Sequence, residues 1–104
     1  MRTLNFIVDK QLIRPDPNCD FSGIVSGTKG YLRAEFSFSK EWEDCRKVAV
    51  FKKTINEECY APLIGNACMV PDDVLSQKKF RVSVIGEKDQ YRITTNRTEV
   101  KQNG

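Results

Sequence analysis

Apolar and polar residues alternate without interruption over residues 31–38, the stretch YLRAEFSF. The apolar positions of this stretch are Leu32, Ala34, Phe36 and Phe38. Successive side chains of a β-strand point to opposite faces, so the pattern predicts a strand with one dry face and one wet face. The rest of the expected fold is arranged around this strand.

The alternation stops at residues 39–45, SKEWEDC, a segment that carries the single tryptophan, Trp42. Residues 48–51, VAVF, then form an apolar run, which is typical of a strand buried on both faces. We therefore expect residues 31–53 to form a hairpin-like unit whose connection places the indole of Trp42 on the core.

Similar short patterns occur along the remaining chain. Strands are predicted at residues 3–8, 24–25, 59–64, 66–70, 79–86 and 91–95, and residues 9–14 are expected to extend the first strand past a bend. Gly65-Asn66 is typical of a hairpin turn, and Pro71 followed by two aspartates predicts one helical turn over residues 71–75. Residues 98–104 are expected to be a weakly ordered continuation. The pattern predicts an all-β, antiparallel β-sandwich of about seven strands with one or two short helical turns, forming a single domain over residues 1–104.

The expected core consists of the bulky residues on the dry faces of these strands, together with the tryptophan. They are Phe36, Phe38, Trp42, Val48, Val50, Phe80, Val82, Val84 and Ile93.

Composition narrows the possible functions. The net charge of +3 comes from 17 basic and 14 acidic residues of interspersed sign, which does not favour a nucleic-acid partner. The chain contains no histidine, the commonest general base and metal ligand. The N-terminal segment MRTLNFIVDK lacks the apolar region of a secretory signal, and no apolar run reaches membrane-spanning length, so we expect synthesis in the cytoplasm with reduced thiols.

The four cysteines, at positions 19, 45, 59 and 68, are separated by 25, 13 and 8 residues. This spacing lacks the Cys-x-x-Cys pairs of structural zinc sites, so no metal is expected. A disulfide between Cys59 and Cys68 and a role as small core residues both remain open. A cysteine nucleophile would need a carboxylate or lysine as its base, and adjacent carboxylates such as Asp72 and Asp73 face apart, so we expect neither catalytic residues nor a cofactor.

Three segments together resemble a known family. They are YLRAEFSFSKEWEDCRKVAVF, CMVPDDVL and FRVSVIGEKDQYRITTN. From Leu4 to about Val100 the chain is similar to the N-terminal domain of baseplate, tail-fibre and receptor-binding proteins of tailed phages and prophages of Gram-positive bacteria. The resemblance implies a β-sandwich virion module that docks a fibre onto the phage tail, made in the host bacterial cytoplasm and then carried in the virion.

Three functions are expected from these observations. The first is a non-enzymatic virion module that acts through protein–protein contacts, as an oligomer. The second is a free inhibitor that binds and blocks a bacterial defence protein, because no coiled coil, collagen-like stretch or receptor-binding head follows the domain before Gly104. The third is a carbohydrate-binding module, which would need exposed aromatic side chains.

The partner is expected to bind an exposed sheet face or edge, where another chain can add a strand. The wet-face residues expected to contact it are Arg33, Glu35, Lys52, Lys53 and Arg81. Arg33, Arg81 and Arg92 would line one face if their strands were neighbours, and we favour a solvated charged face over a nucleic-acid surface.

Overall fold

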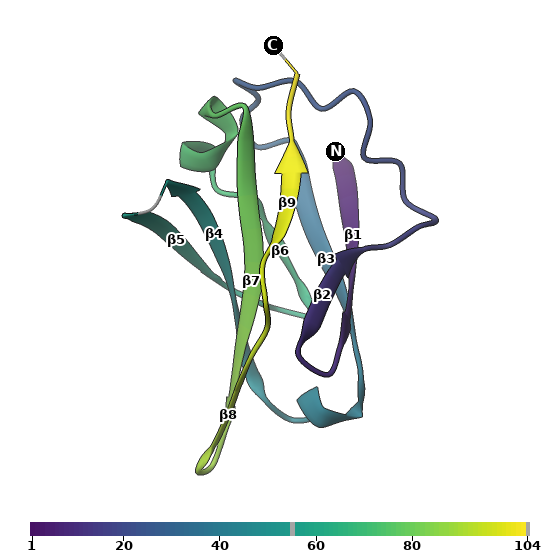
Figure 1. Ribbon diagram of the computed structural model, residues 1–104, viewed down its shortest axis with the longest axis vertical. Coiled ribbons are helices and arrows are strands. Elements are labelled where there is room, and N and C mark those ends of the chain that lie inside the picture. The colour runs from purple at the N-terminus through teal and green to yellow at the C-terminus, as the bar shows by residue number, and fades with distance from the viewer. Residues whose placement is uncertain (55, 104) are drawn as a thin grey trace.

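Two β-sheets pack face to face in the computed structural model, which describes residues 1–54 and 56–103 (Figure 1). Sheet I has the strand order β2-β1-β3-β6 and consists of β1 (Arg2–Asp9), β2 (Leu12–Pro15), β3 (Leu32–Phe38) and β6 (Ala67–Met69). Sheet II has the order β5-β4-β7-β8, with β9 also paired to β7, and consists of β4 (Arg46–Thr54), β5 (Glu57–Pro62), β7 (Lys79–Lys88), β8 (Tyr91–Thr94) and β9 (Thr98–Lys101). The all-β sandwich predicted from the sequence is confirmed, with nine strands in the described residues instead of about seven.

Sheet I contains a pairing that the alternation pattern did not predict. β1 and β3 run parallel, with Arg2 opposite Leu32 and Val8 opposite Phe38, although the other strand pairs are antiparallel. The expected extension of the first strand is wrong. Lys10 has a positive φ of 57°, and the chain reverses there so that β2 returns antiparallel to β1.

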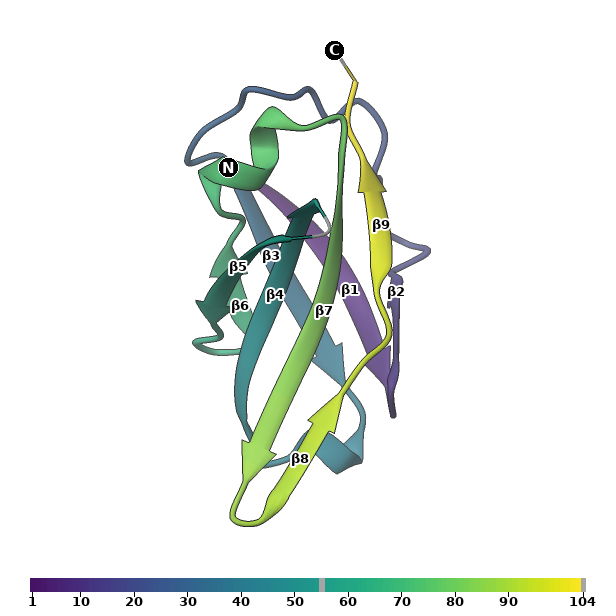
Figure 2. The same cartoon turned by 60° about the vertical axis from the view of Figure 1, so that its left-hand side comes forward.

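In sheet II, the long strand β7 lies between β4 on one side and both β8 and β9 on the other (Figure 2). β8 pairs with the C-terminal half of β7, and β9 pairs with its N-terminal half, where Phe80 lies opposite Val100. The segment after residue 97, expected to be weakly ordered, therefore completes the sheet as β9. At residues 24–25 the expected strand is reduced to an isolated bridge between Val25 and Asn103.

The connection between β3 and β4 crosses from one sheet to the other, so the expected hairpin-like unit is wrong: its two strands are not paired. A 3-10 turn, η1 (Lys40–Trp42), lies in this connection and buries Trp42 completely. The indole Nε1 donates a hydrogen bond to the Lys10 carbonyl oxygen at 2.8 Å, and the ring lies 5.1 Å from that of Phe38.

The two ends of the sandwich use short connections. Gly65 and Asn66, both with positive φ, form the predicted tight turn, which is closed by the antiparallel Ile64–Ala67 bridge and joins β5 of sheet II to β6 of sheet I. The predicted helical turn is present as the 3-10 turn η2 (Asp72–Ser76), which buries Val74 and Leu75 against the core.

Among the described residues, no helix is long and apolar enough to cross a membrane.

Along one side of the sandwich, hydrogen bonds of Asn96 link the edge of sheet I to the segment between β8 and β9. The Ile13 amide donates to the Asn96 side-chain oxygen at 2.9 Å, and the Asn96 amide donates to the Gln11 carbonyl oxygen at 3.0 Å. These bonds satisfy the amide of Ile13 on the edge strand β2 and the carbonyl oxygen of Gln11 in the turn before it.

The space between the sheets contains most of the expected core. Phe36, Trp42, Phe80, Val82, Val84 and Ile93 belong to the buried cluster, and Phe38 packs against it. Val48 and Val50 do not lie between the sheets, because Ala49 and Phe51 are the β4 residues that point inward. The expected core residue Val50 is buried, at 3% exposure, but on the outer side of sheet II, and the expected core position of Val48 is wrong because Val48 is only half-buried there.

Candidate functional site

Four rows of outward-facing side chains cross the strands of sheet II, and we call them the sheet II face; Lys79 and Lys101 lie opposite each other beyond the first row. The first row is charged and contains Glu58, Lys52, Arg81 and Glu99. The two middle rows are largely apolar and contain Tyr60, Val50 and Ser83, then Pro62, Val48, Ile85 and Thr94. The last row is charged and contains Arg46, Glu87 and Arg92. An apolar band therefore crosses the face between two charged borders.

Burial differs sharply within the apolar band. Val50 is only 3% exposed, although it points away from the core, and it lies between Tyr60 and Ser83 of the neighbouring strands. Val48 and Ile85 are half-buried, whereas Tyr60 is 61% exposed. The band therefore has a covered aliphatic floor and one tyrosine that projects from the edge strand β5.

Two hollows lie on this face. One has a volume of about 790 Å³ and is lined by Val48, Pro62 and Leu63 together with the last charged row. The other has a volume of about 690 Å³ and lies toward Ser83, Arg81 and the segment after β8. Tyr60 and Ile85 line both hollows and so lie between them.

The first charged row places like charges side by side. Lys52 and Arg81 are directly opposite on neighbouring strands, an arrangement that destabilises a sheet. Within residues 1–54 and 56–103, neither side chain forms an ion pair, whereas Arg92 and Glu87 in the last row are 3.7 Å apart. Two cations of this face are therefore available to an acidic group of a partner.

The five residues expected to contact a partner do not share one surface. Lys52 and Arg81 lie on the sheet II face, but Lys53 falls at the irregularity of β4 between Lys52 and Thr54 and belongs to none of the four rows. Its ammonium lies 3.1 Å from the Glu57 carboxylate, and the hydrogen bond to Glu57 raises the pKa of Lys53 above its usual value.

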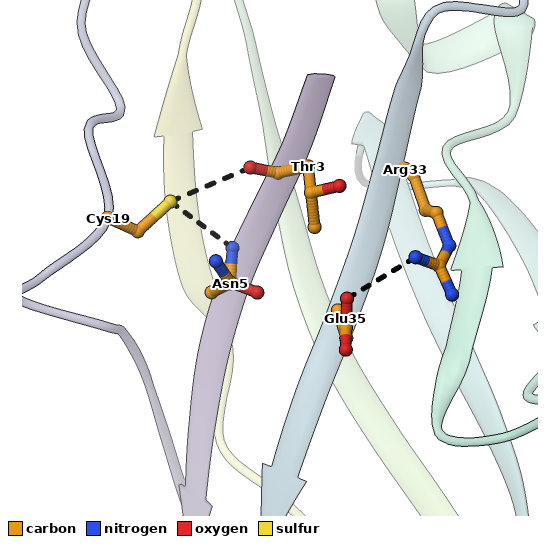
Figure 3. Close-up of polar contacts among 5 residues, drawn as sticks. All are labelled: Thr3, Asn5, Cys19, Arg33 and Glu35. Atoms are coloured by element: carbon orange, nitrogen blue, oxygen red, sulfur yellow. Dashed lines mark hydrogen bonds and ion pairs between the residues drawn. The ribbon is translucent and has the colours of Figure 1, made fainter. Parts of the chain in front are cut away.

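Arg33 and Glu35 lie on β3, on the outer face of sheet I, so they are on the opposite side of the molecule from Lys52. Their side chains form an ion pair of 3.3 Å with each other (Figure 3). The expected grouping of Arg33 with Arg81 and Arg92 is also wrong, because β3 is not in sheet II; Arg81 and Arg92 do share the sheet II face.

The apolar band itself was missed by the sequence prediction. The prediction assigns Val48 and Val50 to the core and gives Tyr60, Pro62 and Ile85 no part in binding. A signal was present at Ile85, because the inward residues of β7 are even-numbered and Ile85 is an apolar residue on the wet side of the strand. On β4 the same alternation applies: Ala49 and Phe51 point inward, so Val48 and Val50 point outward.

The four cysteines are free thiols. Cys59 and Cys68 pack against the core, and burial raises the pKa of the Cys68 thiol to about 11, with a smaller opposing influence of Arg33. Cys19 lies beside β1 where β2 does not reach: the Asn5 amide donates to its Sγ at 3.4 Å, and the Sγ donates to the Thr3 carbonyl oxygen at 3.7 Å (Figure 3). These positions indicate packing and edge-covering roles for Cys19, Cys59 and Cys68.

Groups of three or more metal-ligating side chains do not occur in the described part of the chain. Comparison of the sequence with protein-family models and with curated proteins, and of the structure with solved structures, found no match.

Proposed function

We propose that this chain is a protein-binding β-sandwich module that acts without catalysis, and that its partner docks on the sheet II face. The observation that carries the proposal is the apolar band between two charged borders, with Tyr60 projecting from it at 61% exposure. Protein interfaces have this organisation, an apolar centre within a polar rim, and tyrosine and arginine are enriched among the residues that contribute most to binding.

The resemblance to phage tail domains supports a specific setting for this role. A module of that kind is a component of the virion and holds other tail proteins in place through its surface. The sheet II face suits such a contact because it is continuous over four strand positions and presents both signs of charge at its borders.

The experiment combines particle composition with one surface variant. The protein is expected in purified phage particles produced by the native host, and Tyr60→Asp is expected to abolish its incorporation, because a charge in the centre of an interface must be desolvated. Met69→Asp is the matched control, since Met69 is 40% exposed on sheet I. Both variants should retain the melting temperature, because exposed substitutions away from special features change stability little.

The outcomes separate the candidate functions. A second outcome is that the protein is absent from particles and instead forms a complex in host lysate that is lost in Tyr60→Asp. This result would replace the virion role with that of a free inhibitor. Specific hits on a glycan array that depend on Tyr60 would support a carbohydrate-binding module. Incorporation that is insensitive to Tyr60→Asp and sensitive to Met69→Asp would overturn the assignment of the sheet II face.

A further inference from the structure

We infer, building on the protein-binding role proposed above, that the sheet II face binds a second copy of this chain in a two-fold symmetric, face-to-face dimer. The evidence is the self-complementarity of the four rows. A two-fold interface brings the same patch of both copies together, so each row must fit whichever row the symmetry places opposite it.

Consider a two-fold axis that runs across the strands, between the two apolar rows. This axis places the first charged row of one copy over the last charged row of the other. Each of β5, β4 and β7 lies over the same strand of the other copy, and β9 lies over β8. Arg81 then meets Glu87, and Glu99 meets Arg92. Symmetry doubles both attractive contacts, while Lys52 over Arg46 is the one repulsive pair.

The alternative axis, parallel to the strands, is disfavoured by the same rows. It would place the first row of one copy over the first row of the other with the strand order reversed. Lys52 would then meet Arg81 and Glu58 would meet Glu99, and both pairs repel, whereas Arg46 over Glu87 in the last row would be the one attractive pair. Charge complementarity therefore selects the axis that crosses the strands, since like charges brought together at an interface are costly.

The shape of the face agrees with this choice. The favoured axis places the Tyr60 side chain of each copy over Pro62 of the other, and Pro62 lies in the hollow of about 790 Å³ beside Tyr60. Val50 meets Val48 at the centre of the contact. Each copy thus contributes a projecting tyrosine and receives the tyrosine of its partner in an apolar hollow.

The area of the sheet II face sets the expected affinity of the dimer. Four strands about 4.8 Å apart and four rows about 6.7 Å apart give a footprint of about 500 Å² on each copy. Two copies would bury about 1,000 Å² in total, near the lower limit for a specific interface. A weak, concentration-dependent dimer is therefore expected.

Sedimentation equilibrium of the full chain tests the inference over about 10 μM to about 1 mM, the range in which weak association is measurable. The natural protein should pass from monomer to dimer as concentration rises. Tyr60→Asp should remain monomeric, and Met69→Asp on sheet I should dimerise like the natural protein. A natural protein that stays monomeric throughout, or dimerises equally well with Tyr60→Asp, would overturn the inference.

A charge exchange tests the predicted axis. Glu87→Arg alone and Arg81→Glu alone should each dimerise at least about tenfold more weakly, because both symmetric contacts become repulsive. An equimolar mixture of the two variants should form heterodimers of near-natural affinity, since Arg at 87 then meets Glu at 81 and the second contact is unchanged. Failure of the mixture to associate would exclude this geometry.

These results remain distinguishable from failure of the proposed function. If the natural protein is monomeric but Tyr60→Asp still prevents its incorporation into particles, the sheet II face binds a different protein and only the dimer is excluded. If neither dimerisation nor incorporation depends on Tyr60, both proposals fail.

Discussion

Trp42 lies against Gly86 so closely that a Cβ atom at position 86 would stand 2.8 Å from the indole carbons Cε3 and Cζ3. It would also stand 3.3 Å from the Cβ of Cys45. Gly86 is on β7 and Trp42 is in the connection between β3 and β4, so this contact joins sheet II to the segment that crosses between the sheets. The fully buried indole cannot move aside for an added methyl group.

Gly86→Ala should therefore destabilise the protein. We expect a loss of about 1–3 kcal/mol in the free energy of unfolding, the usual cost of overpacking a core. Urea unfolding followed by tryptophan fluorescence would measure it. Ser37→Ala, at an exposed position of β3, is the control and should stay within about 0.5 kcal/mol. Equal stability of both variants would mean that the indole can shift.

Trp42→Phe tests the other side of the same contact. The smaller ring leaves a cavity and removes the hydrogen bond to the Lys10 carbonyl oxygen. A loss of about 2 kcal/mol is expected from these two effects together. Because this variant lacks the fluorescent reporter, circular dichroism would follow its unfolding in urea. A variant as stable as the natural protein would show that the indole does not hold the connection in place.

The Cys68 thiol should make stability depend on alkaline pH. Burial raises its pKa from 9.0 to about 11, so between these values the unfolded chain loses the proton before the folded chain does. The unfolded state then binds fewer protons, and the free energy of unfolding falls as the pH rises through this window. Cys68→Ala should show a shallower fall.

Urea unfolding under reducing conditions, at several pH values from 8 to 11, would measure both proteins. The other ionisable groups are common to the two proteins, so the difference in slope isolates Cys68. Parallel curves would show that the thiol has the same pKa in both states.

Lys52 and Lys53 provide a paired test of the dimer. Lys52 faces Arg46 of the second copy in the inferred geometry, so Lys52→Glu should strengthen association by about threefold or more as a repulsive contact becomes attractive. Lys53 falls at the irregularity of β4, outside the four rows, and its ammonium is paired with Glu57, so Lys53→Glu should leave association unchanged while losing that ion pair. Sedimentation equilibrium would compare the two. Weaker association of Lys52→Glu would contradict the chosen axis.

Cys19 should tolerate serine better than alanine. A serine hydroxyl can accept from the Asn5 amide and donate to the Thr3 carbonyl oxygen, as the thiol does. Alanine leaves both groups to water at the edge of β1, at an expected cost of about 1 kcal/mol or less, because sulfur forms weak hydrogen bonds. Thermal unfolding of the two variants would rank them.

Local patterns predicted the strands well because alternation is a property of a few consecutive residues. Residues 31–38 and 79–86 alternate as their strands do, and Trp42 lies on the core. The same patterns do not specify which strands pair. The parallel alignment of β1 with β3 depends on a crossing connection, and the Gly65-Asn66 turn forms the same local bend whether its strands share a sheet or not.

The candidate site was only partly predictable for a related reason. Lys52 and Arg81 were expected on a wet face and lie there, but Arg33 and Glu35 are on a different sheet, which only the topology reveals. Val48 and Val50 look like core residues because an apolar run suggests burial on both faces. A band of apolar side chains on an outer face resembles a core strand in sequence, since both lack polar residues.

The hydrogen bonds of Asn96 give the sandwich an asymmetry under mechanical or thermal stress. They fasten β2 to the segment between β8 and β9, so the Ile13 amide, although on an edge strand, should exchange with deuterium as slowly as the central strands. On the opposite side, the edge strands β5 and β6 meet at the Ile64–Ala67 bridge beside their shared turn. Separation of the two layers should therefore start from the β5 side and progress toward Asn96.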